Sequence, residues 1–257
     1  MNFRLFIHTF CAASAVLFTC GATTRADPGD DLIKSGDAAD AKLQEAEALK
    51  FYLPAEKLQP TNARLLVSIS RQYRHLATDA GSRDEKVRFG DIALEYSKRA
   101  AALAPNDSEA QLAVGICYGK LLPYEGTKQQ MAASPLIKAS ADTAIRLDPK
   151  NDLAWFTLGR WHEVLADVTG VKRALGSLVY GKIPTTTNEA AVNCFEKAIE
   201  INPRRLRHYV ELGRTYAQMG RTADARRFIE KGLAMPDLEK DDPETKAHAR
   251  ETLGKLR

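Results

Sequence analysis

Residues 202–236 read NPRRLRHYVELGRTYAQMGRTADARRFIEKGLAMP, and this stretch decides the fold class. A large, an aliphatic, a small and an aromatic residue follow Pro203 at offsets of 6, 9, 10 and 13: Tyr209, Leu212, Gly213 and Tyr216. These offsets share one face of an α-helix. The glycine-containing segment MGRTADA, 219–225, then reads as a tight turn into a second helix. The stretch therefore predicts a hairpin of two packed helices.

The same face recurs in one register along the chain. Its small position is occupied, counting back from the C-terminus, by Gly213, Gly159, Gly115 and Ser70. An alanine stands five residues before each closing proline: Ala198, Ala144, Ala100 and Ala55. Together these residues make the tetratricopeptide pattern W-x2-L-G-x2-Y, A-x3-F, P. We expect an all-α fold, a right-handed α-solenoid of tetratricopeptide-like helical hairpins with inter-helix inserts.

The pattern divides the chain into repeats and one capping helix. We expect a single repeat domain over 27–257. Its repeats are expected at about 29–60, 63–105, 108–149, 152–203 and 206–236. A capping helix is expected at 242–257, with Asp242 as its N-cap and Pro243 at its first position. Asn106 with Glu109 predicts a capping box at an earlier helix start.

Three middle repeats are longer than the pattern requires, with inserts of roughly 11, 10 and 20 residues between their two helices. The longest includes VKRALGSLVYGKIPTTT, 171–187. Helical spacing of Val171, Leu175, Leu178 and Val179 predicts a short amphipathic helix with a buried apolar face. Thr186 with Glu189 predicts a capping box for the next helix. A structural role is favoured; the alternative is a basic contact point made by Lys172, Arg173 and Lys182.

Residues 1–26 have the composition of a targeting segment. They hold Arg4 near the start, no acidic residue, and a mostly apolar run from Leu5 to Phe18. Small residues precede Asp27, as in a secretory signal peptide, and the apolar run is too short to span a membrane. We expect export to a periplasmic or extracellular location and no integral membrane span in the mature chain. The alternatives are an uncleaved anchor, a mitochondrial presequence, or a cytoplasmic chain that keeps this segment.

Removing residues 1–26 would leave 35 basic and 33 acidic residues, a formal net charge of +2. Nucleic-acid binding usually needs a strongly basic surface, so no nucleic-acid partner is expected. Cys117 and Cys194 would be the remaining cysteines. Two cysteines make no disulfide framework, and two small buried apolar side chains are favoured over a bridge between them.

Residues for catalysis are not found. The chain has no phosphate-binding loop, dinucleotide fingerprint, HExxH helix or GxSxG elbow. His162 occupies the aromatic core position of its repeat, so a packed side chain is favoured over a ligand or base. We therefore expect no enzyme activity, no cofactor and no metal site.

Arginines cluster at the positions of this repeat that face the groove. Counting along each first helix, Arg71, Arg160 and Arg214 stand at position 9, Arg64 and Arg207 at position 2, and Arg74 at position 12. Guanidinium groups suit carboxylates. The hypothesis is a groove that binds a protein or an acidic peptide segment. The alternative is a solvated charged face, partly paired with the chain's own Glu and Asp.

Several of these residues resemble one family. LGRW at 158–161, Val164, Ala166, YGKIPTTTNEA at 180–190, Phe195, Ala198 and Pro203 are similar to the regulator of microtubule dynamics family. The resemblance extends loosely over 35–240. It implies an α-helical, non-catalytic binding protein associated with microtubules, and in some members with mitochondria or membrane contact sites. Acidic tubulin tails would suit an arginine-lined groove. The alternative is an exported structural or assembly factor with another partner, because a secretory signal would separate the chain from cytoplasmic microtubules.

Overall fold

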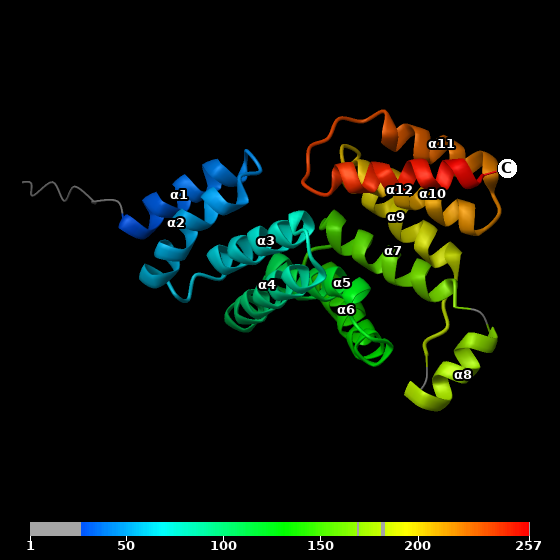
Figure 1. Cartoon of the computed structure of the whole chain (residues 1–257), viewed down its shortest axis with the longest axis horizontal. Helices are drawn as coiled ribbons and strands as arrows, with labels where there is room; N and C mark the ends of the chain where they lie inside the picture. Colours follow the sequence, from blue (N-terminus) through cyan, green and yellow to red (C-terminus); the bar gives the residue numbers. More distant parts are fainter. Residues whose placement is uncertain (1–26, 169, 181–182, 257) are drawn as a thin grey trace, which may run out of the picture.

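The computed structural model describes residues 27–168, 170–180 and 183–256 (Figure 1). In these ranges the chain forms twelve α-helices, a short 3-10 helix and no strand. Most helices pair with a neighbour along the chain: α1 (Pro28–Asp40) with α2 (Glu45–Leu58), α3 (Ala63–Asp79) with α4 (Arg83–Leu103), α5 (Ser108–Leu121) with α6 (Thr127–Leu147), α7 (Asp152–Ala166) with α9 (Asn188–Ile201), and α10 (Leu206–Gln218) with α11 (Thr222–Leu233). The prediction of an all-α solenoid of helical hairpins is confirmed.

The first helices of successive hairpins also touch one another. α3 contacts α5, α5 contacts α7, and α7 contacts α10. They form one layer of the stack, and we call its outer surface the first-helix face. The last helix, α12 (Asp242–Lys255), packs on α10 and α11 through Ala249 and Leu253. It therefore covers the apolar end of the last hairpin.

Small side chains let the two helices of each hairpin lie close together. The four alanines that precede the closing prolines are fully buried: Ala55, Ala100, Ala144 and Ala198. At Gly213, an added Cβ would lie 2.9 Å from both the Ala225 carbonyl oxygen and the Ile229 nitrogen of α11. At Gly159, it would lie 2.8 Å from the Phe195 ring of α9. A larger residue at either position would push the second helix away.

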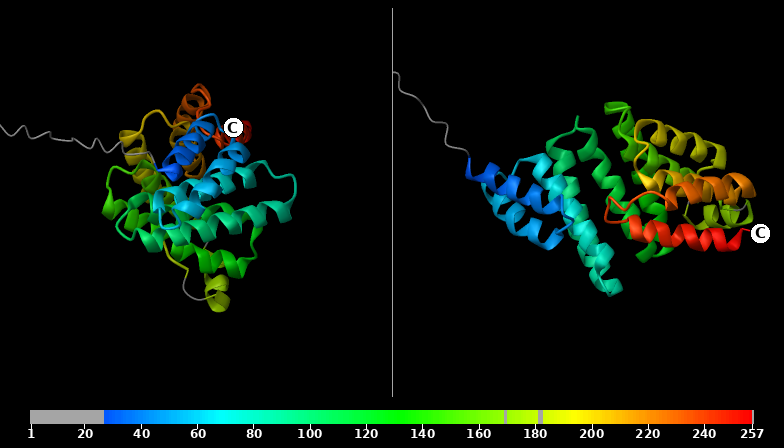
Figure 2. Two further views of the ribbon diagram at one scale, coloured as in Figure 1. Left: turned by 90° about the vertical axis from the view of Figure 1, so that its left-hand side faces the viewer. Right: turned by 90° about the horizontal axis from the view of Figure 1, so that it is seen from above.

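The inserts take two forms. The first two lengthen helices, since α4 and α6 each have 21 residues against 12 in α11, and a 3-10 turn, η1 (Leu122–Tyr124), joins α5 to α6. The third forms α8 (Gly170–Tyr180), which stands apart from the stack (Figures 1 and 2). The short helix was predicted. The prediction that its apolar face is buried is wrong at Leu178, which is 84% exposed. The side chains of Val171, Leu175 and Val179 lie outside the described residues.

The insert is anchored beyond α8 instead. Ile183 is buried against Ile137, Trp161 and Leu165, which belong to α6 and α7. Gly176 of α8 faces the same side chain, because an added Cβ would lie 2.7 Å from Ile183 Cδ1. An isoleucine in the return segment therefore holds the insert to the body.

Helix starts differ from the predicted ones by one residue. Asp107, not Asn106, caps α5 by accepting a hydrogen bond from Ala110 N at 2.8 Å. Thr187, not Thr186, caps α9. Asp241, not Asp242, precedes α12.

Each displaced residue has another role. The Thr186 hydroxyl hydrogen-bonds to His162 Nδ1, and the half-buried His162 ring packs edge-on against Trp161. Asp242 is 2% exposed and accepts hydrogen bonds from Leu238 N and Glu239 N, both at 2.8 Å. It folds the loop before α12 into a turn.

A matched pair of substitutions tests the close approach at Gly213. Gly213→Ala should lower the free energy of unfolding by about 1–3 kcal/mol, because the new Cβ meets the backbone of α11. Gly119→Ala, in α5, has nothing within 4 Å of the new Cβ and should be neutral or stabilising by about 0.5–1 kcal/mol. Urea unfolding followed by circular dichroism measures both. Equal effects at the two sites would show that interhelical contact does not set the requirement for glycine.

Candidate functional site on the first-helix face

The six arginines singled out in the sequence all lie on first helices. Arg64, Arg71 and Arg74 belong to α3, Arg160 to α7, and Arg207 and Arg214 to α10. The structure does not bring them together as a bare basic stripe. It distributes them over three clusters, in which most of the guanidinium groups already contact carboxylates of this chain.

The first cluster joins α3 to the end of α1. Arg64 Nη2 lies 3.2 Å from Asp37 Oδ2, and Arg71 forms an ion pair with Asp40. Tyr52 also donates a hydrogen bond to Asp37, at 2.7 Å. Arg64 remains 81% exposed as a side chain, so this ion pair is weak and open to solvent.

The second cluster joins α7 to α10. Arg160 contacts both Glu163 and Glu211, and Arg214 Nη1 lies 2.8 Å from Glu211 Oε2. Burial, together with the neighbouring Glu211, raises the pKa of Glu163 to about 7. Burial also acts to raise the pKa of Glu211, but Arg160 and Arg214 outweigh burial and lower it. Reversing the charge of Arg160 and Arg214 would thus strand two buried carboxylates, so these residues are poor positions for testing ligand binding.

The third cluster is formed by the loop between α11 and α12. We call residues 234–241 the acidic loop, because they include Asp237, Glu239 and Asp241 against a single basic residue, Lys240. Glu239 Oε2 lies 2.5 Å from Arg207 Nη2, and Glu239 Oε1 lies 2.9 Å from Arg205 Nε. The acidic loop therefore lies against the cations at the start of α10.

Asp241 reaches further along the stack. Its Oδ1 accepts hydrogen bonds from Lys120 Nζ of α5 at 2.9 Å and from Thr78 Oγ1 of α3 at 3.1 Å. Its Oδ2 lies 3.8 Å from Arg207 Nη2. One carboxylate thus contacts the second, third and fifth hairpins, so the first-helix face is concave. In Figure 1 the acidic loop points from α11 and α12 toward the end of α3.

Lys240 adds two contacts on the same side. Its Nζ lies 2.6 Å from Asp79 Oδ2 at the end of α3 and 3.3 Å from Glu45 Oε1 at the start of α2. Lys240 and Asp241 together tie the last hairpin to the first three across the concave face.

Arg74 differs from the other five arginines. Among the described residues no carboxylate lies within ion-pairing distance of it, and its Nε is buried without a hydrogen-bond partner. Burial lowers the pKa of Arg74, opposed by nearby Asp241. Burial and the neighbouring Arg74 also lower the pKa of His75 to about 3, which keeps His75 neutral. Arg74 is thus a cation held inside the concave face with donor capacity to spare.

Of the three residues of the predicted basic contact point on the insert, the structure describes the side chain of Arg173. Arg173 donates hydrogen bonds to the carbonyl oxygens of Leu165 at 2.7 Å and Val168 at 3.1 Å, and it also reaches Pro184 O. Leu165 belongs to the last turn of α7, Val168 follows that helix, and Pro184 lies in the return segment, so Arg173 ties α8 to both ends of the insert. The side chain of Lys172 and the whole of Lys182 lie outside the described residues.

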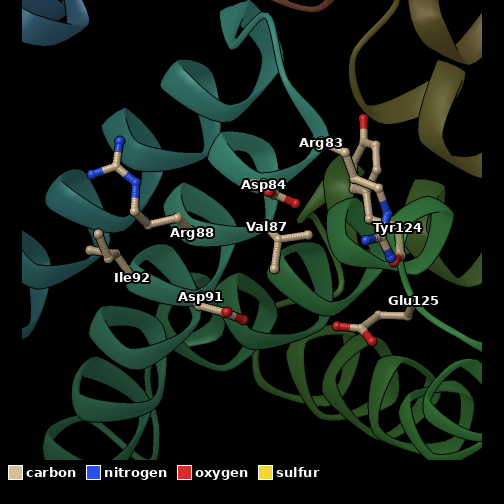
Figure 3. A pocket seen from close by; sticks show the side chains of 8 residues that line it. All are labelled: Arg83, Asp84, Val87, Arg88, Asp91, Ile92, Tyr124 and Glu125. Atoms are coloured by element: carbon tan, nitrogen blue, oxygen red, sulfur yellow. The ribbon is translucent and has the colours of Figure 1, made fainter.

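One cavity lies away from the concave face. It has a volume of about 510 Å³ and is bounded by α4 and by the turn that leads from η1 into α6 (Figure 3). Arg83 and Arg88 stand there beside Asp84, Asp91 and Glu125, so the charges of its lining are largely balanced. Arg83 is already bound to the Tyr124 carbonyl oxygen. The cavity presents no nucleophile paired with a base.

Other site types receive no support from the part of the chain that the structure describes. No cluster of three or more His, Cys, Asp or Glu there could hold a metal ion. No helix in those ranges is both long and apolar enough to cross a membrane. Cys117 and Cys194 are buried and free, and burial raises the pKa of Cys194 to about 11.

The sequence patterns did not point to Lys120, Arg205, Glu239 and Asp241. Lys120 stands at position 13 of its first helix, which is a groove-facing position of this repeat, but the pattern that drew attention was one of arginines. Arg205 precedes the first position of its helix. Glu239 and Asp241 lie between helices, where the repeat pattern gives no register. The acidic run PDLEKDDPE, 236–244, was the signal that could have drawn attention to the loop.

The charge of Asp241 should make the third cluster sensitive to pH. Burial by itself would raise the pKa of Asp241, but Lys120 and Arg207 outweigh burial and lower it to about 2 from an ordinary value of 3.8. A carboxylate with a lowered pKa stabilises the fold above its ordinary pKa, and this contribution is lost as the pH falls toward 2.

Asp241→Asn should therefore lower the free energy of unfolding at pH 7 by about 2 kcal/mol. The difference from the wild type should shrink between about pH 4 and pH 2, as chemical unfolding at several pH values would measure. Asp237→Asn is the control, because Asp237 contacts Lys246 of α12 rather than the concave face. A constant difference across that pH range would contradict the assignment.

Comparisons with known proteins place the chain in a family. The family model described as "Regulator of microtubule dynamics protein 1-3" matches residues 32–257. Regulator of microtubule dynamics protein 1 of Bos taurus is 27% identical over 220 residues, covering 84% of this chain and 69% of that protein. Regulator of microtubule dynamics protein 3 of Xenopus laevis is 25% identical over 240 residues, covering 90% of this chain and 52% of that protein. The chain thus spans only about half the length of some relatives.

Solved structures agree on the fold. A tetratricopeptide repeat protein of Thermus thermophilus is similar with a TM-score of 0.63 at 16% identity, covering 88% of this chain and 98% of that chain. The match to the family model covers far more than half of the sequence and includes all the hairpins but the start of the first. The chain is therefore a member of the regulator of microtubule dynamics family, with a tetratricopeptide-like helical-repeat fold.

Proposed function

We propose that the protein is a non-catalytic adaptor that binds an acidic segment of a protein partner on its concave first-helix face. One observation carries the proposal: an acidic segment of the chain itself already lies there. Glu239 and Asp241 contact Arg205, Arg207 and Lys120 at 2.5–3.8 Å. These cations therefore form a surface that is shaped to receive carboxylates.

The fold and the charge distribution support the same proposal. A helical-repeat stack offers an extended concave surface for protein segments. Cations that are half-buried bind carboxylates more strongly than fully solvated ones, because fewer water molecules compete. Arg74 supplies an inner positive charge without an ion-pair partner among the described residues.

Family membership suggests a source for the acidic segment. The relatives are named regulators of microtubule dynamics. Acidic tubulin tails would meet the chemical requirement of the concave face, so we propose them as the partner segment for a chain located in the cytoplasm. An exported chain would bind an acidic segment of another partner and would act as a structural or assembly factor.

A labelled hexaglutamate peptide tests the binding mode. Fluorescence anisotropy at low ionic strength should show binding that weakens as salt is added, while hexaglutamine should not bind. Arg74→Gln should weaken binding at least about fivefold, whereas Arg74→Lys should weaken it less, because the charge remains although the guanidinium donors are lost. Arg226→Gln is the control, because Arg226 lies on the second helix α11, near Glu230.

Equal weakening by the Arg74 and Arg226 substitutions would contradict the assignment to the concave face. Co-sedimentation with microtubules supplies the second probe. Binding should fall when the acidic tubulin tails are removed by proteolysis, and binding that is independent of the tails would overturn the tubulin proposal.

We also propose that residues 1–26 act as an export signal, on their composition alone. The mature protein should then begin at Asp27, which N-terminal sequencing of protein recovered from cell fractions would show. Recovery of full-length protein with Met1 from the cytoplasm would overturn export and leave tubulin as the favoured source of the acidic segment.

A further inference from the structure

We infer that the acidic loop is an internal competitor for a carboxylate-binding site on the concave face. The site consists of Arg74, Thr78, Lys120, Arg205 and Arg207, and we call it the cage. An acidic peptide that presents two carboxylates within one turn would enter the cage when the acidic loop moves out. This inference rests on the proposed function and adds where the ligand binds and what occupies that place in its absence.

The cage is assembled from parts of the chain that are far apart. Thr78 and Lys120 stand 163 and 121 residues from Asp241 in the sequence. Three hairpins contribute side chains to the cage. Arg74 and Thr78 come from α3, and Lys120 comes from α5. Arg207 comes from α10, whose N-cap is Arg205. Apart from the carboxylates of the acidic loop, the donors Lys120, Arg205 and Arg207 have two described acidic ion-pair partners. Asp152 lies 3.3 Å from Arg205, and Glu244 lies 3.9 Å from Lys120. Without the loop, the four cations of the cage would outnumber these two carboxylates.

The acidic loop supplies two carboxylates to this site. Asp242 holds the backbone of Leu238 and Glu239 in a turn, and this turn directs Glu239 and Asp241 toward the cage. Asp237 faces the other way, toward Lys246. The loop therefore presents two carboxylates, two residues apart, as an acidic peptide ligand would.

The attachment of the loop is suited to exchange. Residues 236–238 are exposed, and Leu238 is 52% exposed, so this part buries little apolar surface. The contacts of Glu239, Lys240 and Asp241 are ionic and partly accessible to solvent. Opening them exposes a short loop and leaves the packed apolar core of the hairpins intact. The two ends of the loop stay anchored, since Met235 at its start and the helix α12 after it pack on α10 and α11.

The cage also has donors that the acidic loop leaves unused. Arg74 Nε, Arg205 Nη1 and Arg207 Nε are all buried without a hydrogen-bond partner. Buried donors are normally paired, and an unpaired one costs free energy. A contact that served only to clamp the solenoid would be expected to satisfy these groups. Their spare capacity fits a ligand with more acceptor oxygens than the loop provides.

Neutralising the loop in the full-length protein tests the inference. The variant Glu239→Gln/Asp241→Asn removes both carboxylates from the cage and keeps the cations. The matched control Asp237→Asn removes one charge from the same loop without touching the cage. The probe is the labelled peptide PDLEKDDPE, which copies residues 236–244, and PNLQKNNPQ is its counterpart without carboxylate side chains.

We expect the double variant to bind PDLEKDDPE and hexaglutamate at least about tenfold more tightly than the wild type, because the tethered loop no longer competes at high effective concentration. Asp237→Asn should bind like the wild type, and PNLQKNNPQ should bind to none of them. Hydrogen exchange of residues 234–241 should accelerate in the double variant, and in the wild type when the peptide is added.

The outcomes separate the two proposals. Equal affinity of the wild type and the double variant for both acidic peptides would overturn the competition and leave the proposed function standing. Loss of stability with no binding of either peptide by any variant would overturn both, and would make the loop a structural clamp. If the double variant does not fold, Glu239→Gln alone is measured in the same way, with a smaller gain in affinity expected and no gain overturning the inference.

Discussion

The structure depends on one contact that recurs along the chain, a small residue of a first helix against the second helix of the same hairpin. Gly213 lies against the backbone of α11, and Gly159 lies against the Phe195 ring of α9. The distance between the paired helices follows from these contacts, and the stacking of hairpins follows from that distance. The curvature of the stack then decides which side chains of distant hairpins can meet. The acidic loop reaches Thr78 and Lys120 because the stack curves that far.

Curvature also explains why the arginines are not a free basic stripe. Four of the six are drawn against a carboxylate of another element: Asp37 and Asp40 from α1, Glu211 from α10, and Glu239 and Asp241 from the acidic loop. Arg214 pairs with Glu211 on its own helix. Removing a buried charge from such a network costs more than the pair itself contributes, because the partner is left desolvated. Arg74 has no ion-pair partner among the described residues, so replacing it leaves no paired carboxylate desolvated. It is therefore the more informative position for a binding test.

The sequence was sufficient for the parts of the structure that depend on local periodicity. The spacing of Tyr209, Leu212, Gly213 and Tyr216 predicts the hairpin, and the same spacing puts six arginines on first helices. Helix caps were predicted one residue too early at Asn106 and Thr186 and one too late at Asp242. The cap in fact stands two residues after the proline in three repeats, at Asn62, Asp107 and Asn151. The ion-pair partners were not predictable, because Asp241 is 163 residues from Thr78 and only the curved stack brings them together.

A concave face whose charges are mostly compensated within the chain constrains how a partner can bind. Simple addition of an acidic segment would place it beside Glu239 and Asp241 and would meet repulsion. Binding by exchange avoids this repulsion, because incoming carboxylates take the place of outgoing ones and the buried cations are never left alone. Exchange also gives selectivity, since a segment with too few carboxylates could not displace a loop held at high effective concentration. The internal compensation of the arginines is therefore compatible with a binding role, and it sets the minimum charge that a ligand must carry.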